Sequence, residues 1–219
     1  MDAAHAEERA AFQLERMILF SDAVFAIAIT LLIIEIKVPE LHGPEANELT
    51  LLYAIRNLIP KFLGFLISFI LIGMYWTVHH RMFGYVAGIT PKLMRLNLLF
   101  LLTIVLMPFS TGLFGEYSRP SAIHLKTPFV AYIINVSFTG IATFFLWAYI
   151  GNPSNGVADP SLDATTVRQA KTRAILIPTI FALAIPVAFV NPYLARYVPL
   201  LLPIALRIVK RRARVALRS

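Results

Sequence analysis

Apolar segments long enough to cross a lipid bilayer run through most of this chain and limit the folds it can adopt. A hydrocarbon core of about 30 Å needs roughly 20 residues of helix at about 1.5 Å per residue. Six segments reach or approach that length: 17–36, 60–80, 96–115, 128–150, 174–190 and 193–209. The composition agrees, since 58% of the residues are hydrophobic and only 15% are charged. The sequence therefore predicts an all-α, multi-pass membrane protein with six transmembrane helices in one domain.

Two regions interrupt this regular pattern. The last two segments are short, contain several prolines and meet at Asn191-Pro192, which favours a tight pair of kinked helices. Residues 38–59 separate the first two spans, and their latter part spaces apolar residues at helical intervals. We expect a short amphipathic helix there, lying on the outer surface of the membrane.

The distribution of basic residues predicts the orientation in the membrane. If the N-terminus is cytoplasmic, most of the 20 lysines and arginines fall in the segments on the cytoplasmic side, as the positive-inside rule requires. Both termini are then cytoplasmic. The expected organisation is a cytoplasmic N-terminal segment at 1–15, a membrane domain at 16–209 and a basic tail at 210–219. Residues 1–15 are acidic, unlike the start of a cleaved signal peptide, so we expect the first span to be retained.

The formal net charge of +8 raises the question of a nucleic-acid partner. The basic tail, however, directly follows an apolar segment, where such clusters set topology and contact anionic lipid. We therefore expect membrane lipids, and no nucleic acid, as partners of the tail.

No motif for catalysis or cofactor binding occurs in the chain. Cysteine is absent, and so are the P-loop, GxGxxG, GxSxG and HExxH patterns. The adjacent pair His79-His80 cannot chelate one metal from one helix face, because neighbouring residues point about 100° apart. A polar anchor or an interhelical hydrogen bond is one interpretation of the pair, and a metal or proton-relay role is the other. We expect neither an enzyme nor a resident metal or cofactor.

The first span has two different faces. On a helical wheel Ile27, Thr30, Leu31 and Ile34 form one stripe, apolar except for the threonine hydroxyl. Ser21 and Asp22 straddle the opposite side. They are expected either to cap the start of the helix or to pair with neighbouring helices, with Arg16, His79, His80 and Asn97 as possible partners. Both interpretations leave the stripe free, and without further information it would face lipid or protein.

The start of the first span also resembles a known signature. It reads RMILFSDAVFAIAITLL from Arg16 onward and is similar to the RxxxFSD motif of the TMEM175 family of potassium channels. Arg16, Phe20, Ser21 and Asp22 match every defined position of the motif. The segments WTVHHRMF and RLNLLFLLTIVLMPFST also resemble family sequences. A single six-helix unit is similar to the prokaryotic members, whereas the animal proteins contain two.

The resemblance implies a homotetrameric channel of a prokaryotic cell membrane, with a fold unlike other potassium channels. Four copies of the first helix would line a central pore for K⁺. Ile27, Leu31 and Ile34 would form an apolar constriction, and Thr30 would favour potassium over sodium. Arg16, Phe20, Ser21 and Asp22 would hold the helix in place. No TVGYG filter sequence is present, so we expect modest selectivity.

Other interpretations of the same residues remain open. A proton channel would use Asp22 and the two histidines as titrating groups. A secondary transporter would show broken helices at mid-membrane, and only Pro178 and Pro186 suggest such breaks in this sequence. A scaffold would carry no ion flux. Glu35, near the end of the stripe, would either concentrate cations or pair with Lys37 at the interface.

Overall fold

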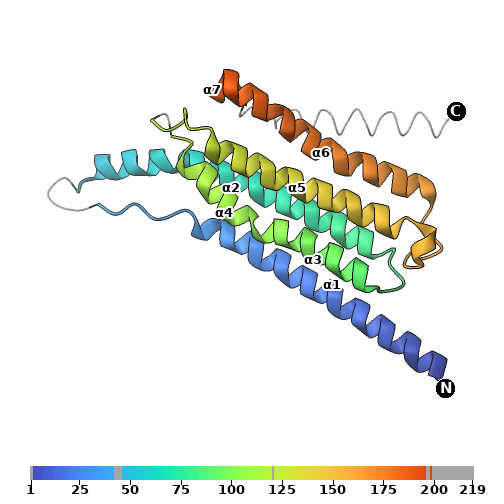
Figure 1. Ribbon diagram of the computed structural model, residues 1–219. Coiled ribbons are helices and arrows are strands. Elements are labelled where there is room, and N and C mark those ends of the chain that lie inside the picture. Colours follow the sequence, from blue (N-terminus) through green and yellow to red (C-terminus); the bar gives the residue numbers. More distant parts are fainter. Residues whose placement is uncertain (1, 42–45, 120, 196–197, 199–219) are drawn as a thin grey trace, which may run out of the picture.

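The protein is a bundle of long helices (Figure 1). The computed structural model describes residues 2–41, 46–119, 121–195 and 198. Its elements are α1 (Asp2–Ile34), α2 (Glu48–Phe83), α3 (Pro91–Val105), α4 (Met107–Glu116), α5 (Thr127–Ile150), the 3₁₀ turn η1 (Pro153–Asn155), α6 (Ala164–Val190) and α7 (Pro192–Ala195). Five stretches of this described chain are long and apolar enough to span a membrane: Glu8–Ile34, Glu48–Phe83, Pro91–Glu116, Thr127–Ile150 and Ala164–Val190.

These stretches confirm the all-α fold class and overlap the first five expected spans, although several of them begin earlier than expected. The expected sixth span, 193–209, and the basic tail, 210–219, lie outside the described residues apart from 193–195 and 198. The junction before them is described. Asn191 ends α6, and its side-chain oxygen accepts hydrogen bonds from the backbone N–H groups of Tyr193 at 2.9 Å and Leu194 at 3.1 Å. The helix is therefore interrupted at Asn191-Pro192, the position at which the last two segments were expected to meet.

The second helix differs from the prediction. Instead of a separate surface helix before a span at 60–80, α2 is one helix of 36 residues. Asn47 and Thr50 form a capping box that starts the helix well before the span. Pro60 removes only one backbone donor and is accommodated inside the helix. At about 1.5 Å per residue, α2 is longer than the hydrocarbon core is thick, so part of it extends beyond the membrane.

The third span is divided into α3 and α4 at Leu106. Pro108 lies two residues after the break and cannot donate a hydrogen bond to the carbonyl of Ile104, which interrupts the helical ladder there. Pro178 and Pro186, by contrast, lie inside a continuous α6. Proline position alone therefore does not show where a membrane helix breaks.

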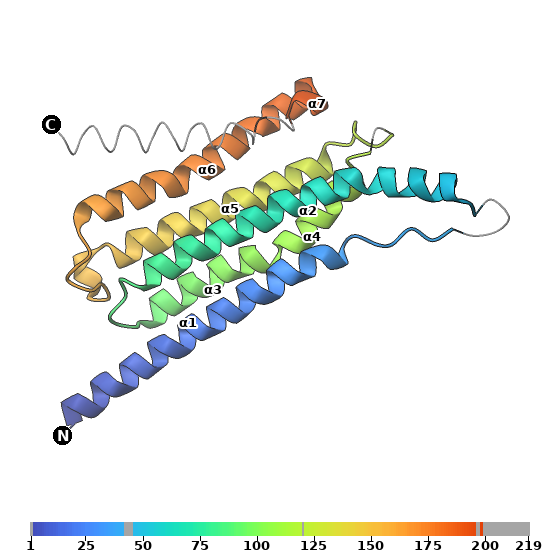
Figure 2. The same ribbon diagram turned by 180° about the vertical axis from the view of Figure 1, so that it is seen from behind.

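The helices are arranged with α1 at one edge of the bundle and α6 at the other (Figures 1 and 2). Helix α1 packs against α2, α3 and α4, whereas α6 packs mainly against α5. Two glycines, one in α5 and one directly after it, permit this close approach: a Cβ at Gly140 would overlap the ring of Pro178, and one at Gly151 would overlap the side chain of Val167. In membranes such small residues bring helix backbones together.

The connections between the helices alternate between the two ends of the bundle. The start of α1, the α2–α3 connection (84–90) and the α5–α6 connection (151–163) lie at one end, which we call the N-terminal end (Figures 1 and 2). The α1–α2 and α4–α5 connections lie at the opposite end. The orientation predicted from the loop charges also places successive connections on opposite sides of the membrane, which agrees with this alternation for the described spans.

Candidate functional site

The two faces of α1 lie in different surroundings. The predicted stripe is exposed, with 59% of Ile27, 39% of Leu31 and 67% of Ile34 accessible, and Thr30 is exposed as well. The opposite face packs into the bundle through Phe25, Ala28 and Leu32, all of them buried. A single chain therefore leaves the stripe available to lipid, to another copy or to a pore.

Thr30 contributes the only hydroxyl of this stripe. Its Oγ1 lies 3.0 Å from the carbonyl oxygen of Ala26 and 2.9 Å from that of Ile27, so the hydroxyl proton is donated to its own helix. The oxygen then presents its lone pairs as an acceptor on the exposed face. An acceptor of this kind suits a cation or the water molecules around it.

A buried chain of hydrogen bonds joins the other face of α1 to α2 and α3. Ser21 Oγ donates to the carbonyl of Met17 at 2.8 Å and accepts from Asn97 Nδ2 at 2.9 Å. Asn97 Oδ1 lies 2.8 Å from His79 Nε2. The three hydrogen-bonded side chains, Ser21, Asn97 and His79, are all buried. Two of the predicted polar partners, His79 and Asn97, are thus connected by hydrogen bonds to Ser21 of the RxxxFSD motif.

Asp22 has a donor that the sequence did not indicate. The indole Nε1 of Trp76 donates to Asp22 Oδ1 at 2.9 Å, rather than Arg16, His79, His80 or Asn97. His80 stacks on the Trp76 ring, with centroids 5.6 Å apart, and is exposed. The two histidines therefore diverge, and His79 alone enters the bundle.

Aromatic rings enclose His79 inside the bundle. The rings of Phe83, Phe100 and Phe25 lie 4.2, 5.4 and 5.6 Å from its centroid.

We call the set of Ser21, Asp22, Trp76, His79 and Asn97 the polar anchor of α1. Across the described ranges, no cluster of three or more His, Asp or Glu side chains is arranged to hold a metal ion.

Arg16 and Phe20, the other two motif residues, are not members of the polar anchor. Both are exposed, and they line a hollow of about 520 Å³ between α1 and α3. The guanidinium of Arg16 lies 5.8 Å from the centroid of the Phe12 ring, one turn earlier on α1. The motif therefore points in two directions, with Ser21 and Asp22 toward the bundle and Arg16 and Phe20 toward its surface.

Charged residues gather at the opposite end of the bundle. The carboxylate of Glu35 lies against α4, in the space that a Cβ at position 112 would take, so Gly112 leaves room for it. Glu35 and Lys61 line one small hollow, and Lys61 is paired with Glu116. Glu35 thus neighbours Lys61 of α2, whereas Lys37 was the partner considered from the sequence.

A second polar group lies in the core, and the sequence alone did not predict it. Thr111 Oγ1 donates to Ser68 Oγ at 2.7 Å, and Ser68 Oγ lies 3.1 Å from Tyr132 Oη. These contacts join α4, α2 and α5. Ser68, Tyr75 and His79 recur at helical spacing on one face of α2, a pattern that would have marked this face as buried.

These features define a multi-pass helical membrane protein whose first helix is anchored on one side and exposes an apolar face with one hydroxyl on the other. A family model described as "Endosomal/lysosomal potassium channel TMEM175" matches residues 16–108. A protein of Streptomyces collinus named a potassium channel is 36% identical over 173 residues, which cover 78% of this chain and 81% of that protein. The chain belongs to the TMEM175 family.

Animal relatives and solved structures agree with this assignment. The TMEM175 protein of Gallus gallus, named an endosomal/lysosomal proton channel, is 35% identical over 137 residues, or 61% of this chain and 27% of that longer protein. The crystal structure of a Chamaesiphon minutus homologue, titled a lysosomal potassium-selective channel TMEM175 homolog, superimposes with a TM-score of 0.72 at 29% identity. That match covers 92% of this chain and 98% of the other.

Proposed function

We propose that this protein is a potassium channel of a prokaryotic cell membrane, in which four copies surround a pore lined by α1. The observation that carries the proposal is the division of α1 into an anchored polar face and an exposed stripe. The names of the Streptomyces relative and of the Chamaesiphon structure support potassium as the permeant ion. The N-terminal end of the bundle would face the cytoplasm, and a chain of six spans would also have its C-terminus on that side.

The chemistry of the stripe supports a hydrophobic constriction. Four copies of Ile27 around an axis form a narrow apolar ring that offers no ligands to an ion and excludes water when closed. Leu31 and Ile34 continue the lining toward the opposite end. Opening requires α1 to move outward, and Thr30 then supplies hydroxyl oxygens to the hydrated ion. Selectivity from hydroxyl contacts of this kind is expected to be modest.

Proton conduction is the second candidate function, because the animal relatives are named proton channels. Asp22 and His79 would be the titrating groups. The surroundings of both favour a structural role, since Asp22 accepts from Trp76 and His79 is enclosed by aromatic rings. A transporter is less well supported, because α6 continues through Pro178 and Pro186, and among the five described spans only the third is broken, at Leu106.

Flux into liposomes tests the proposal. Purified protein in vesicles should pass K⁺ faster than Na⁺ and H⁺, at rates above those of empty vesicles. Ile27→Trp should abolish the flux by filling the constriction, whereas Leu183→Trp, at an exposed position on α6, should leave it unchanged. Flux of protons alone would support the second candidate, and no flux above empty vesicles would contradict both. Light scattering of the detergent-solubilised protein should give the mass of four chains.

A further inference from the structure

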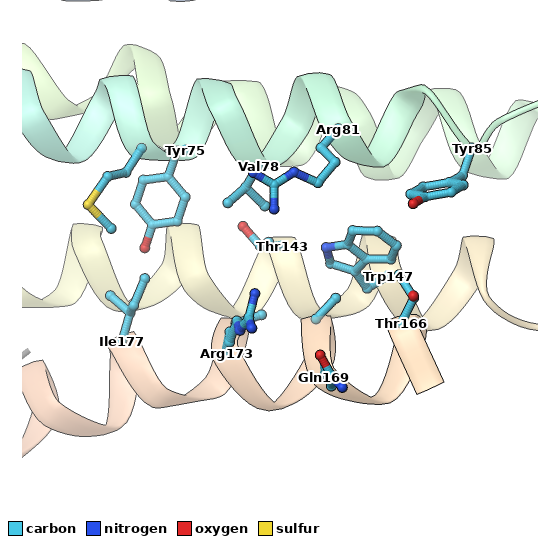
Figure 3. A pocket seen from close by; sticks show the side chains of 13 residues that line it. Tyr75, Val78, Arg81, Tyr85, Thr143, Trp147, Thr166, Gln169, Arg173 and Ile177 are labelled. Atoms are coloured by element: carbon cyan, nitrogen blue, oxygen red, sulfur yellow. The ribbon is translucent and has the colours of Figure 1, made fainter. Parts of the chain in front are cut away.

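A cavity between α2, α5 and α6 is separate from the α1 stripe and has no part in the proposed pore. Its volume is about 410 Å³, within the size range of small-molecule sites. Arg81 on α2 and Arg173 on α6 extend into it from opposite walls, and Thr143 and Trp147 on α5 lie between them (Figure 3). We propose that this cavity binds one anionic phospholipid of the membrane, with its phosphate between Arg81 and Arg173.

The charge of the cavity favours an anion. Two guanidinium groups line it, and none of its lining residues is an aspartate or glutamate. Within the part of the chain that the structure describes, neither Arg81 nor Arg173 forms an ion pair. Two arginine forks facing each other match a phosphate, which accepts charge-assisted hydrogen bonds from both.

Neutral donors surround the same position. The side-chain amide of Gln169 on α6 can donate to an anion there, whereas the hydroxyl of Thr166, which also lines the cavity, already donates to Asp163. Trp147 is buried, and its indole ring borders the cavity beside Arg81 (Figure 3). Gln169 and Trp147 would bind the non-bridging oxygens and the glycerol hydroxyls of a headgroup.

The other half of the cavity is apolar, and this favours a lipid over a free phosphate. Met74, Val78 and Ile177 continue the lining away from the arginines toward the middle of the bundle. A soluble anion would leave this surface uncovered, whereas an acyl chain would cover it. Arg81 belongs to the last turn of α2, the level at which interfacial residues meet lipid headgroups. Basic pockets between membrane helices at this level are typical headgroup sites.

A bound lipid would also hold α6 to the rest of the bundle. Helix α6 packs mainly against α5, and the cavity lies between α6 and α2. A phosphate contacting both arginines would bridge that gap. The site does not depend on ion permeation, so failure of the flux experiment and failure of lipid binding can be distinguished.

Native mass spectrometry of the detergent-solubilised protein tests the proposal, with phosphatidylglycerol and phosphatidylcholine of identical acyl chains as probes. The wild type should retain phosphatidylglycerol in preference to phosphatidylcholine. The double variant R81Q/R173Q should bind phosphatidylglycerol at least about tenfold more weakly, because both charge-assisted contacts are lost. The matched control R95Q/R168Q removes two exposed arginines that do not line the cavity, and it should bind like the wild type.

A second variant keeps the test independent of the arginines. Ala170→Phe fills the cavity and preserves both charges, so it should also lose the lipid. Equal retention of the two lipids by the wild type, or equal loss in both double variants, would overturn the proposal. Displacement of the lipid by millimolar glycerol phosphate would assign the site to a soluble anion and would overturn the lipid assignment.

Discussion

Replacing Asn97 with leucine tests the polar anchor most sharply. Leucine has nearly the shape of asparagine but makes neither the bond to Ser21 Oγ at 2.9 Å nor the bond to His79 Nε2 at 2.8 Å. Interhelical hydrogen bonds in membrane proteins contribute about 0.6 kcal/mol on average and at most about 1.7 kcal/mol each. Losing two of them should lower the free energy of unfolding by about 1–3 kcal/mol. Ser21 keeps its bond to Met17, so the loss falls mainly on the contacts between helices.

Equilibrium unfolding in mixed micelles measures this change. Met94→Leu serves as the control, because Met94 lies on the same helix, is 46% exposed and is not part of the anchor. A double-mutant cycle of Asn97→Leu with Ser21→Ala should show a coupling of about 0.5 kcal/mol or more. If the unfolding free energy of the Asn97 variant stayed within about 0.3 kcal/mol of the control, these bonds would not hold α1 and the reasoning would be wrong.

Three further predictions concern the stripe and the α6 cap. Ile27→Asn should wet the constriction and raise potassium current in planar bilayers; an unchanged conductance would remove Ile27 from the constriction. Thr30→Ala should lower the ratio of K⁺ to Na⁺ permeability, and an unaltered reversal potential would count against its role. The hydroxyl and amide of Thr166 donate to Asp163 and hold the pKa of its carboxyl below the ordinary 3.8. The cap is therefore strongest above that pH and weakens as pH falls through the lowered pKa, so the thermal midpoint of the wild type should decline there more than that of Asp163→Asn; equal declines would contradict this.

Much of the fold could be predicted from the length of the apolar segments and from the helical period. The first five spans follow from runs of apolar residues, because a helix that crosses the bilayer needs a run of that length wherever it lies. The two faces of α1 likewise follow from the period of one helix, which is local information. Ser21 faces the bundle and Ile27 faces away, as the wheel predicts.

Contacts between helices could not be derived in this way. The sequence suggested four partners for Asp22 and did not include Trp76, because the partner depends on how α1 and α2 are rotated against each other. Glu35 neighbours Lys61 for the same reason, and its carboxylate lies in the space left by Gly112 of a third helix. The start of α2 was also not predicted correctly. The helix begins at the Asn47 cap and continues through Pro60, whereas the sequence suggested a span starting at residue 60.

Thiol accessibility along α1 tests the central claim that potassium passes along the exposed stripe. The natural chain contains no cysteine, so single variants can be compared without removing other thiols. Ile34→Cys places a thiol on the stripe, and Ile33→Cys places one on an exposed neighbouring position that the wheel directs away from it. In planar bilayers under a potassium gradient, a cationic methanethiosulfonate reagent should block the current of Ile34→Cys and leave that of Ile33→Cys unchanged. Block of Ile33→Cys with Ile34→Cys unaffected, or no potassium current from the wild type, would contradict the account.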